Sequence, residues 1–377
     1  MPPERIEKPW QEARRILAVR LDNIGDIFML GPALRALKCA LPQARLTLMC
    51  SPAGAQAAEL LPWVDDTLVW RAVWQDISGA LALDPRRELE LVETLRRGRY
   101  DAALIFTSFT QSPYPPAYAC YLAGIPLRAG QSQEFGGGLL THWWKPPPDG
   151  GHQVDRNLAL LERLGFPPAG RRMELRLPAA ARERAERLLQ AAGIEPGAPF
   201  IALAPGASAA ARRYPAARFA GAARLLSGRT GLPVVVLGSP REAELAAPFL
   251  APETGAASLV GQTGLAESCA ILERAALVLA NNSASLHIAD ALGRPMVILY
   301  SGAEQLTQWE PRFAPARLLY RPVACSPCHR FTCPYGLECL DIAPEEVAAS
   351  AAGLLAEASA AALNTPATPA GGPAASG

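Results

Sequence analysis

Asp26 is the side chain best placed in this sequence for acid–base chemistry. An apolar, strand-like run over residues 16–21 leads directly into DNIGD, residues 22–26, and then into a helical pattern that ends near Leu41. A glycine at such a junction lets a ligand approach the backbone, and open parallel sheets bind their ligands at this edge. Asp26 is therefore a candidate general base. The alternative is that Asp22 and Asn23 cap the helix and Asp26 only favours its positive end.

A second group of polar residues follows the strand-like run at residues 200–204. The small residues PGAS, 205–208, come first, and Arg212 and Arg213 follow before the next helical pattern. Backbone N–H groups of small residues can face an anion, the Ser208 hydroxyl can donate to a phosphate oxygen, and Arg212 supplies positive charge. The pattern predicts a phosphate site, although PGAS also fits an ordinary turn.

Two further strand ends carry candidate ligand-binding side chains. Asn282, Ser283 and Ala284 stand at the entrance of a helical pattern, and His287 falls on the same helical face as Ser283. His287 could contact a phosphate or a sugar, or simply bond to a nearby carbonyl. Glu242 follows another strand-like run and could accept ribose hydroxyls, or only favour the start of a helix.

Four cysteines near the C-terminus could bind a metal. Cys325, Cys328, Cys333 and Cys339 follow the spacing C-x2-C-x4-C-x5-C, which superficially suits zinc or an iron–sulfur cluster. The paired C-x2-C motifs of common zinc sites are absent, so we expect no bound metal, with a structural metal as the alternative.

Strand-like and helical patterns alternate in two series, which predicts an α/β fold with two doubly wound parallel sheets. The sequence divides into domains at residues 1–170 and 171–360, joined near 165–177, and the tail 361–377 is predicted to be disordered. Residues 112–121 and 136–138 are expected to form loops. The expected strands are 16–21, 46–50, 67–70, 102–106, 200–204, 233–237, 275–280 and 296–300, and the expected helices are 33–41, 53–61, 87–97, 216–226, 241–250, 265–273 and 285–292.

Composition limits the classes of partner. The net charge of the 377 residues is +1, which argues against a nucleic-acid binder driven by charge. Only three lysines are present, so phosphate must be met by arginine, backbone N–H groups or helix ends. The sequence has no apolar run of the ~18 to 20 residues that span a bilayer and no secretory signal, so a cytoplasmic protein is expected.

Taken in order, these motifs resemble glycosyltransferase family 9, the ADP-heptose:lipopolysaccharide heptosyltransferase family. The resemblance rests on RILAVRLDNIGDIFMLGP, APGASAAARRYPAARFAGAARLL, VVVLGSPREAELA, LVLANNSASLHIADALGRPMVILYSG and CSPCHRFTCPYGLECLDIAPEEV, and it spans nearly all of residues 15–355. It implies a GT-B architecture, in which two Rossmann-like domains face each other across a cleft. The first domain would receive the acceptor and the second would hold the nucleotide sugar.

The resemblance also implies roles for particular residues. Asp26 falls on the family's general-base position, Ser208 and Arg212 on positions that contact the diphosphate, and Glu242 on the nucleoside-side acidic position. The remaining matches, to the family's Asp-(Ser/Thr)-Gly-x-x-His stretch, are Asn282, Ser283, Ala284 and His287. Asn282 stands where many members have Asp, which removes a negative charge near the donor. Ala284 replaces the usual Gly, which narrows the space for backbone approach.

The resulting interpretation is an inverting, metal-independent glycosyltransferase without a cofactor. Asp26 would take the proton of an acceptor hydroxyl, while Ser208, Arg212 and helix N-termini stabilise the leaving diphosphate. The best expectation is heptose from ADP-heptose, transferred to a lipopolysaccharide core or another lipid-linked or oligosaccharide acceptor, with possible peripheral contact with the inner membrane. Alternatives are a GT-B sugar-nucleotide epimerase or hydrolase, which needs further acid–base groups near the donor sugar, and a non-catalytic binding module.

Overall fold

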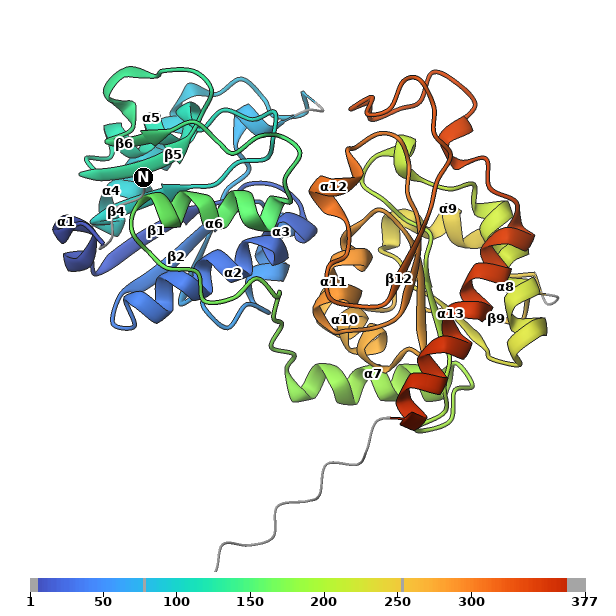
Figure 1. Cartoon of the computed structure of the whole chain (residues 1–377). Coiled ribbons are helices and arrows are strands. Elements are labelled where there is room, and N and C mark those ends of the chain that lie inside the picture. The colour runs from blue at the N-terminus through green and yellow to red at the C-terminus, as the bar shows by residue number, and fades with distance from the viewer. Residues whose placement is uncertain (1–5, 77–78, 252–253, 365–377) are drawn as a thin grey trace, which may run out of the picture.

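The chain folds around two six-stranded parallel sheets, one in each half of the sequence (Figure 1). The computed structural model describes residues 6–76, 79–251 and 254–364, with side chains to residue 360. The first sheet has the strand order β3-β2-β1-β4-β5-β6. Its strands are β1 (Arg15–Val19), β2 (Arg45–Cys50), β3 (Asp66–Val69), β4 (Ala102–Ile105), β5 (Leu127–Gln131) and β6 (His142–Trp144).

The second sheet repeats this plan with the order β12-β11-β10-β7-β8-β9. Its strands are β7 (Ile201–Ala204), β8 (Val234–Val236), β9 (Ala256–Ser258), β10 (Leu277–Asn281), β11 (Met296–Leu299) and β12 (Ala316–Leu319). In both sheets the order reverses between the first and fourth strands, β1 beside β4 and β7 beside β10. Ligands of open parallel sheets bind beyond the carboxyl ends of the strands at such a reversal.

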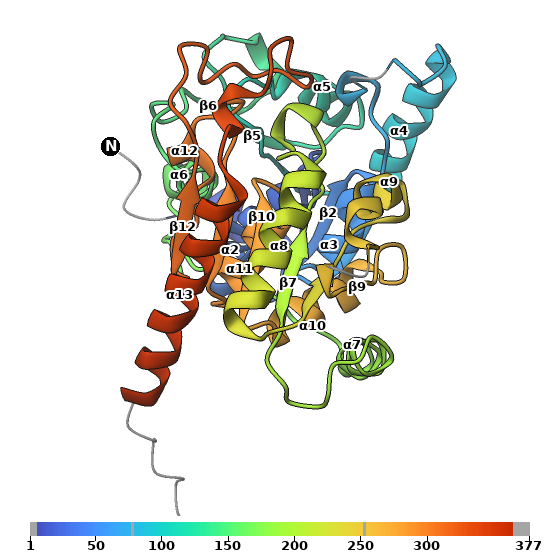
Figure 2. The same ribbon diagram turned by 90° about the vertical axis from the view of Figure 1, so that its right-hand side faces the viewer.

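Helices cover the sheets of both halves (Figures 1 and 2). In the first half α2 packs against α3 and α6, and in the second half α8 packs against α13 and α7 against α10. The helices of the first half are α1 (Lys8–Glu12), α2 (Ile24–Ala40), α3 (Pro52–Ala58), α4 (Pro85–Gly98), α5 (Tyr114–Leu122) and α6 (Gln153–Arg163). Those of the second are α7 (Ala179–Ala191), α8 (Ala216–Thr230), α9 (Ala243–Ala246), α10 (Leu265–Arg274), α11 (Ala284–Ala291), α12 (Leu306–Trp309) and α13 (Pro344–Asn364).

The two halves meet through helices that carry polar residues at their N-termini. Helix α2 of the first half packs against α11 of the second. Most of α2 is buried because apolar residues occur on nearly all of its faces, as expected for a helix held between a sheet and a neighbouring domain. One cluster of buried apolar side chains extends through both halves. The packing therefore brings the starts of α2 and α11 to the boundary between the halves.

All eight expected strands are present, but other expectations were wrong. Residues 112–121, expected as a loop, form most of α5, because Pro115 and Pro116 occupy the first turn, where a helix tolerates proline. The expected helix 241–250 consists of 3-10 turns around the short α9, and Pro248 lies in the second 3-10 turn. Helix α13 extends to Asn364, so the predicted tail begins too early. The rest of the tail lies outside the described residues.

Four strands escaped prediction because their sequences lack a clear apolar run. β6, β9 and β12 are only half-buried, and β5 contains Arg128, Gly130 and Gln131. Among the described residues, no helix has the length and apolar character needed to cross a membrane.

Candidate functional site

Asp26 lies in the first turn of α2, directly after the loop that follows β1. Its Oδ1 accepts a hydrogen bond from Arg20 Nη2 at 2.8 Å, and its Oδ2 accepts one from the backbone N–H of Asn23 at 3.2 Å. The second bond is the helix-capping contact that the alternative interpretation anticipated. The capping contact leaves lone pairs on both oxygens, and the side chain retains 12% exposure. Capping and proton transfer are therefore compatible at Asp26.

Arg20 is a wholly buried cation that organises this loop, and sequence reasoning overlooked it. It pairs with Asp22 as well as Asp26, through Nε and Oδ2 at 2.8 Å, and donates from Nη2 to the Ser108 hydroxyl at 2.8 Å. Burial and the neighbouring Asp26 raise the pKa of Asp22 above its usual value, although Arg20 opposes them. A buried guanidinium needs paired anions, so Arg20 fixes the position of both carboxylates.

His287 connects the two halves at this point. It lies in α11 and packs on Gly25 at the start of α2, so closely that a Cβ on residue 25 would lie 2.6 Å from its Cδ2. Burial lowers the pKa of His287 to about 3, and the positive charges of His152 and Arg212 act in the same direction. The imidazole is thus neutral at physiological pH. Its Nδ1 is buried and has no hydrogen-bond partner among the described residues.

Arg212 and Asn282 meet at the carboxyl end of the second sheet, through a shared partner that sequence reasoning missed. Arg212 Nη1 donates to Glu304 Oε1 at 2.9 Å, and Asn282 Nδ2 donates to Glu304 Oε2 at 2.9 Å. Arg212 Nη2 also donates to the exposed Ser208 hydroxyl. Asn282 stands where the family often has Asp, and Glu304 therefore places a carboxylate beside this neutral side chain.

The position of Glu304 could have been found from its place in the sequence. It follows β11 after a short polar and small stretch, SGAE, residues 301–304, as the other candidates follow their strands. Burial raises the pKa of Glu304, the nearby Asp26 carboxylate raises it further, and Arg212 and Asn282 oppose the rise. Because Asp26 and Glu304 interact, the two halves contribute carboxylates to one region.

Asn281 and Arg213 hold the loops that carry these residues. The buried Asn281 donates from Nδ2 to Pro205 O at 2.7 Å and accepts at Oδ1 from Tyr214 N at 3.0 Å. Arg213 Nε donates to Ala207 O at 2.8 Å. Both side chains thus hold the backbone of residues 205–208, the candidate phosphate loop, while Arg212 extends toward Glu304.

Glu242 and the residues at the start of α11 occupy different surroundings. Glu242 accepts bonds from the backbone N–H and hydroxyl of Ser239 at 2.6 and 2.9 Å, which is the helix-start interaction that the alternative predicted. Its carboxylate also lies against Gly206, where a Cβ would clash, so it borders the loop of Ser208. Ser283 is the N-cap residue of α11, and Ala284 is its first residue. Both are half-exposed.

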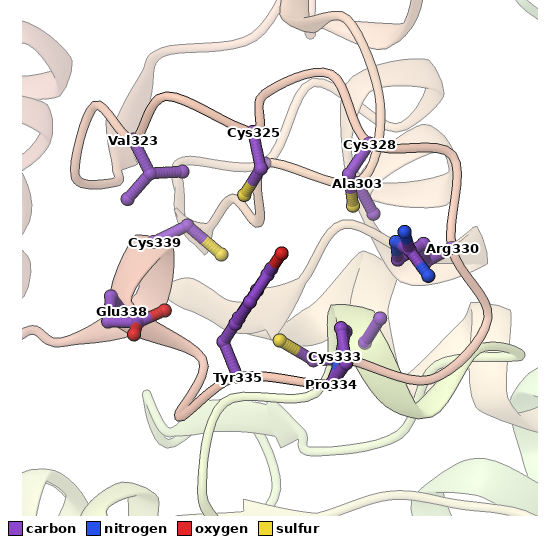
Figure 3. A pocket seen from close by; sticks show the side chains of 12 residues that line it. Ala303, Val323, Cys325, Cys328, Arg330, Cys333, Pro334, Tyr335, Glu338 and Cys339 are labelled. Carbon is purple, nitrogen blue, oxygen red and sulfur yellow. The ribbon is translucent and has the colours of Figure 1, made fainter.

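The four C-terminal cysteines face a small cavity, beside the loop that bears Glu304 (Figure 3). Cys325, Cys328, Cys333 and Cys339 line about 20 Å³ of space together with Tyr335, and all four thiols are free. Burial, with the other three thiols nearby, raises the pKa of Cys339. Within the described ranges, no three His, Cys, Asp or Glu side chains are arranged to hold a metal ion. The absence of a metal stays a prediction.

The chain is similar to known proteins of one family. The model of glycosyltransferase family 9 (heptosyltransferase) matches residues 88–338. Lipopolysaccharide heptosyltransferase 2 of Salmonella typhimurium is 28% identical over 297 residues, which cover 76% of this chain and 82% of that protein. Among solved structures, ADP-heptose lps heptosyltransferase II of E. coli superposes with a TM-score of 0.72 at 23% identity, covering 91% of this chain and 99% of that one.

A second solved structure is E. coli heptosyltransferase WaaC with ADP-2-deoxy-2-fluoro heptose. It has a TM-score of 0.62 at 17% identity, and the match covers 82% of this chain and 93% of that one.

Two parallel sheets of this order, with polar loops at the boundary between the halves, define the GT-B fold of these solved structures. The family model covers well over half of the chain, and the chain belongs to glycosyltransferase family 9.

Proposed function

We propose that this enzyme transfers a heptose from ADP-heptose to a lipopolysaccharide core acceptor, with inversion at the anomeric carbon. The observation that carries the proposal is the contact between His287 and Gly25, because it joins the candidate base loop of one half to the candidate donor helix of the other. The choice of sugar and acceptor is supported by the relatives named lipopolysaccharide heptosyltransferases and by the relative solved with an ADP-heptose analogue.

The donor diphosphate would lie against Arg212 and Ser208. Arg212 is the cation at the carboxyl end of the second sheet, and its side chain is 15% exposed, so it faces the boundary region without being freely solvated. Charge-assisted bonds to phosphate are strong in such surroundings. The Nδ1 atom of His287 is buried and has no hydrogen-bond partner in the described residues, and buried polar atoms are seldom left unpaired. A polar atom of the nucleotide sugar would supply that partner.

The nucleoside end of the donor would lie near Glu242. Glu242 borders the Ser208 loop, and we propose that its carboxylate accepts ribose hydroxyls. Ser283 and Ala284 would bring the N-terminal end of α11 to the diphosphate, where its backbone N–H groups favour negative charge.

The reaction follows from the placement of charges. Asp26 takes the proton of the acceptor hydroxyl as its oxygen forms a bond to the anomeric carbon, and the bond from that carbon to the diphosphate breaks on the opposite face. One displacement inverts the configuration. Arg212 and Ser208 stabilise the charge gained by the leaving ADP, which permits catalysis without a metal. Arg20 keeps Asp26 oriented toward the boundary between the halves.

The proposal is tested by incubating purified protein with a panel of nucleotide sugars, with and without truncated lipopolysaccharide, in the presence of EDTA. We expect transfer only from ADP-heptose and only in the presence of acceptor. The configuration at the anomeric carbon should change, from α to β or from β to α. Release or conversion of the sugar without acceptor would instead favour the hydrolase or epimerase. Binding without turnover would favour a non-catalytic module, and loss of transfer in EDTA would contradict the metal-independent mechanism.

A further inference from the structure

Glu304 holds two polar side chains of the proposed donor site, those of Arg212 and Asn282. One carboxylate oxygen accepts from Arg212 and the other from Asn282, each at 2.9 Å. The Glu304 side chain is 25% exposed, so the pair is partly shielded from solvent and its attraction is stronger than that of a surface ion pair.

The guanidinium of Arg212 already donates a hydrogen bond from each of its terminal nitrogens. Its Nη1 donates to Glu304 and its Nη2 to Ser208, whereas its buried Nε has no hydrogen-bond partner in the part of the chain that the structure describes. A diphosphate that binds Arg212 through Nη1 and Asn282 through Nδ2 therefore competes with the carboxylate for both donors. Two anions at one partly buried guanidinium also repel each other, so the carboxylate lowers the affinity of Arg212 for a diphosphate.

The fold holds the two ends of this ion pair in place through one loop. In the cysteine loop, residues 325–339, the backbone N–H groups of Cys328 and His329 donate to Gly302 O at 3.0 Å and Ala303 O at 2.8 Å, just before Glu304. In the same loop, Phe331 O accepts from Ala211 N at 2.9 Å, just before Arg212. The backbone just before Glu304 and the backbone just before Arg212 are thus both hydrogen-bonded to the cysteine loop. This arrangement of the backbone brings the two charged side chains together.

The charged and titratable groups around Glu304 favour its release once a diphosphate arrives. Asp26 of the other half repels it, and Arg212 is the cation that holds it. Tyr300, at the end of β11, is buried and neutral because burial, with Glu304 nearby, raises its pKa. When a diphosphate takes over Arg212, nothing among these groups compensates the carboxylate, and its protonated form becomes favoured.

We propose that Glu304 is an exchangeable counter-ion, which holds Arg212 and Asn282 in the unliganded enzyme and is displaced from them by the diphosphate of the donor. The inference rests on the proposed function, because it takes Arg212 as the phosphate ligand. Competition from Glu304 lowers the affinity for the donor and for the product ADP alike. The enzyme gains faster release of ADP after transfer, because the returning carboxylate replaces the leaving anion.

The test is calorimetric binding of ADP and of adenosine to the wild type, to Glu304→Gln and to Glu345→Gln. Glu345 is an exposed carboxylate in the first turn of α13, so its variant controls for the loss of one negative charge. We expect Glu304→Gln to bind ADP roughly tenfold more tightly than the wild type, with adenosine unchanged, since it removes a full opposing charge. Glu345→Gln should match the wild type for both ligands.

The pH dependence provides a second readout on the same proteins. Protonated Glu304 does not compete, so the ratio of the wild-type Kd to the Glu304→Gln Kd should approach one as the pH falls through the raised pKa of Glu304, and widen above it. The ionisation of ADP itself is common to both proteins and cancels in the ratio. Glu304→Ala removes the same carboxylate and replaces the Gln variant if that one does not fold.

Arg212→Ala separates failure of this inference from failure of the proposed function. If Arg212→Ala, made in the Glu304→Gln protein, leaves ADP binding unchanged, then Arg212 is not the phosphate ligand and both proposals fall. If it weakens ADP binding while Glu304→Gln alone binds no more tightly than the wild type, the diphosphate site stands and the counter-ion exchange is overturned.

Discussion

His287 of the second half lies directly against Gly25 of the first, with no room for a side chain between them. Any β-carbon at residue 25 would come within 2.6 Å of the imidazole, a distance that Cβ atoms do not tolerate. The glycine is required here by the approach of the other domain. Its backbone lies in a helix, so left-handed geometry is not the reason.

Gly25→Ala should therefore displace α11 from α2 and separate the proposed base from the proposed donor site. We expect turnover to fall roughly ten- to a hundredfold, because a shift of about 1 Å between reacting groups has that effect. Gly31→Ala is the matched control, since residue 31 lies in the same helix and its Cβ would meet only Leu61 Cδ2, at 3.4 Å. Wild-type turnover in Gly25→Ala would show that the contact does not set the catalytic geometry.

Asp26→Asn should lower turnover by roughly a hundredfold or more while ADP binding stays near normal, because the amide cannot accept the acceptor's proton. Steady-state kinetics and calorimetry check the two parts. Asn23→Ala tests the capping interpretation, since it changes the N-cap residue and keeps the Asp26 carboxylate. Equal losses of activity in both variants would show that Asp26 acts through the helix start.

Arg212→Ala should raise the Kd for ADP about ten- to a hundredfold and leave the Kd for adenosine nearly unchanged. The reason is that the lost contact is charge-assisted and local to phosphate. Arg213 is a poor control, because its side chain braces the Ala207 carbonyl. Arg224, exposed on α8, is the better one. Calorimetry with both ligands decides, and equal losses for ADP and adenosine would indicate a folding defect.

His287 should make the protein less stable in mild acid. Its pKa is about 3 in the folded state against an ordinary value of 6.5, so below pH 6.5 the unfolded chain binds a proton that the folded one refuses. The free energy of unfolding should fall as the pH drops from 6.5 toward 3, and His287→Gln should show a shallower fall. Urea titrations at pH 7.5 and 5 measure the difference.

His152 adds to the same dependence of the free energy of unfolding on pH, because burial lowers its pKa to about 4. His152 is unchanged in the His287 variant. The control is His329→Asn, which replaces a histidine at an exposed position with φ near +52° that Asn tolerates and leaves the contact between His287 and Gly25 in place. If the free energy of unfolding changed equally with pH in His287→Gln and in the wild type, His287 would bind a proton as readily in the folded state as in the unfolded one.

The sequence by itself determined the layered α/β architecture, the alternation of strands and helices along the chain and which strand ends bear polar groups. Those features are local: apolar runs such as residues 277–280 are buried on both faces, and polar residues follow them at the ends of the strands. It therefore predicted Asp26, Arg212, Asn282 and His287 as residues of strand ends. Half-buried strands such as β12 carry no such run and escaped prediction.

The tertiary structure alone decided which strand ends meet. Arg20 and Asp26 are six residues apart, but Arg212 and Glu304 are separated by 92 and pair only because β7 and β11 flank β10 in one sheet. The approach of His287 to Gly25 depends on the packing of one domain on the other. Such contacts arise from the summed burial of whole helices and sheets, which no short sequence pattern records.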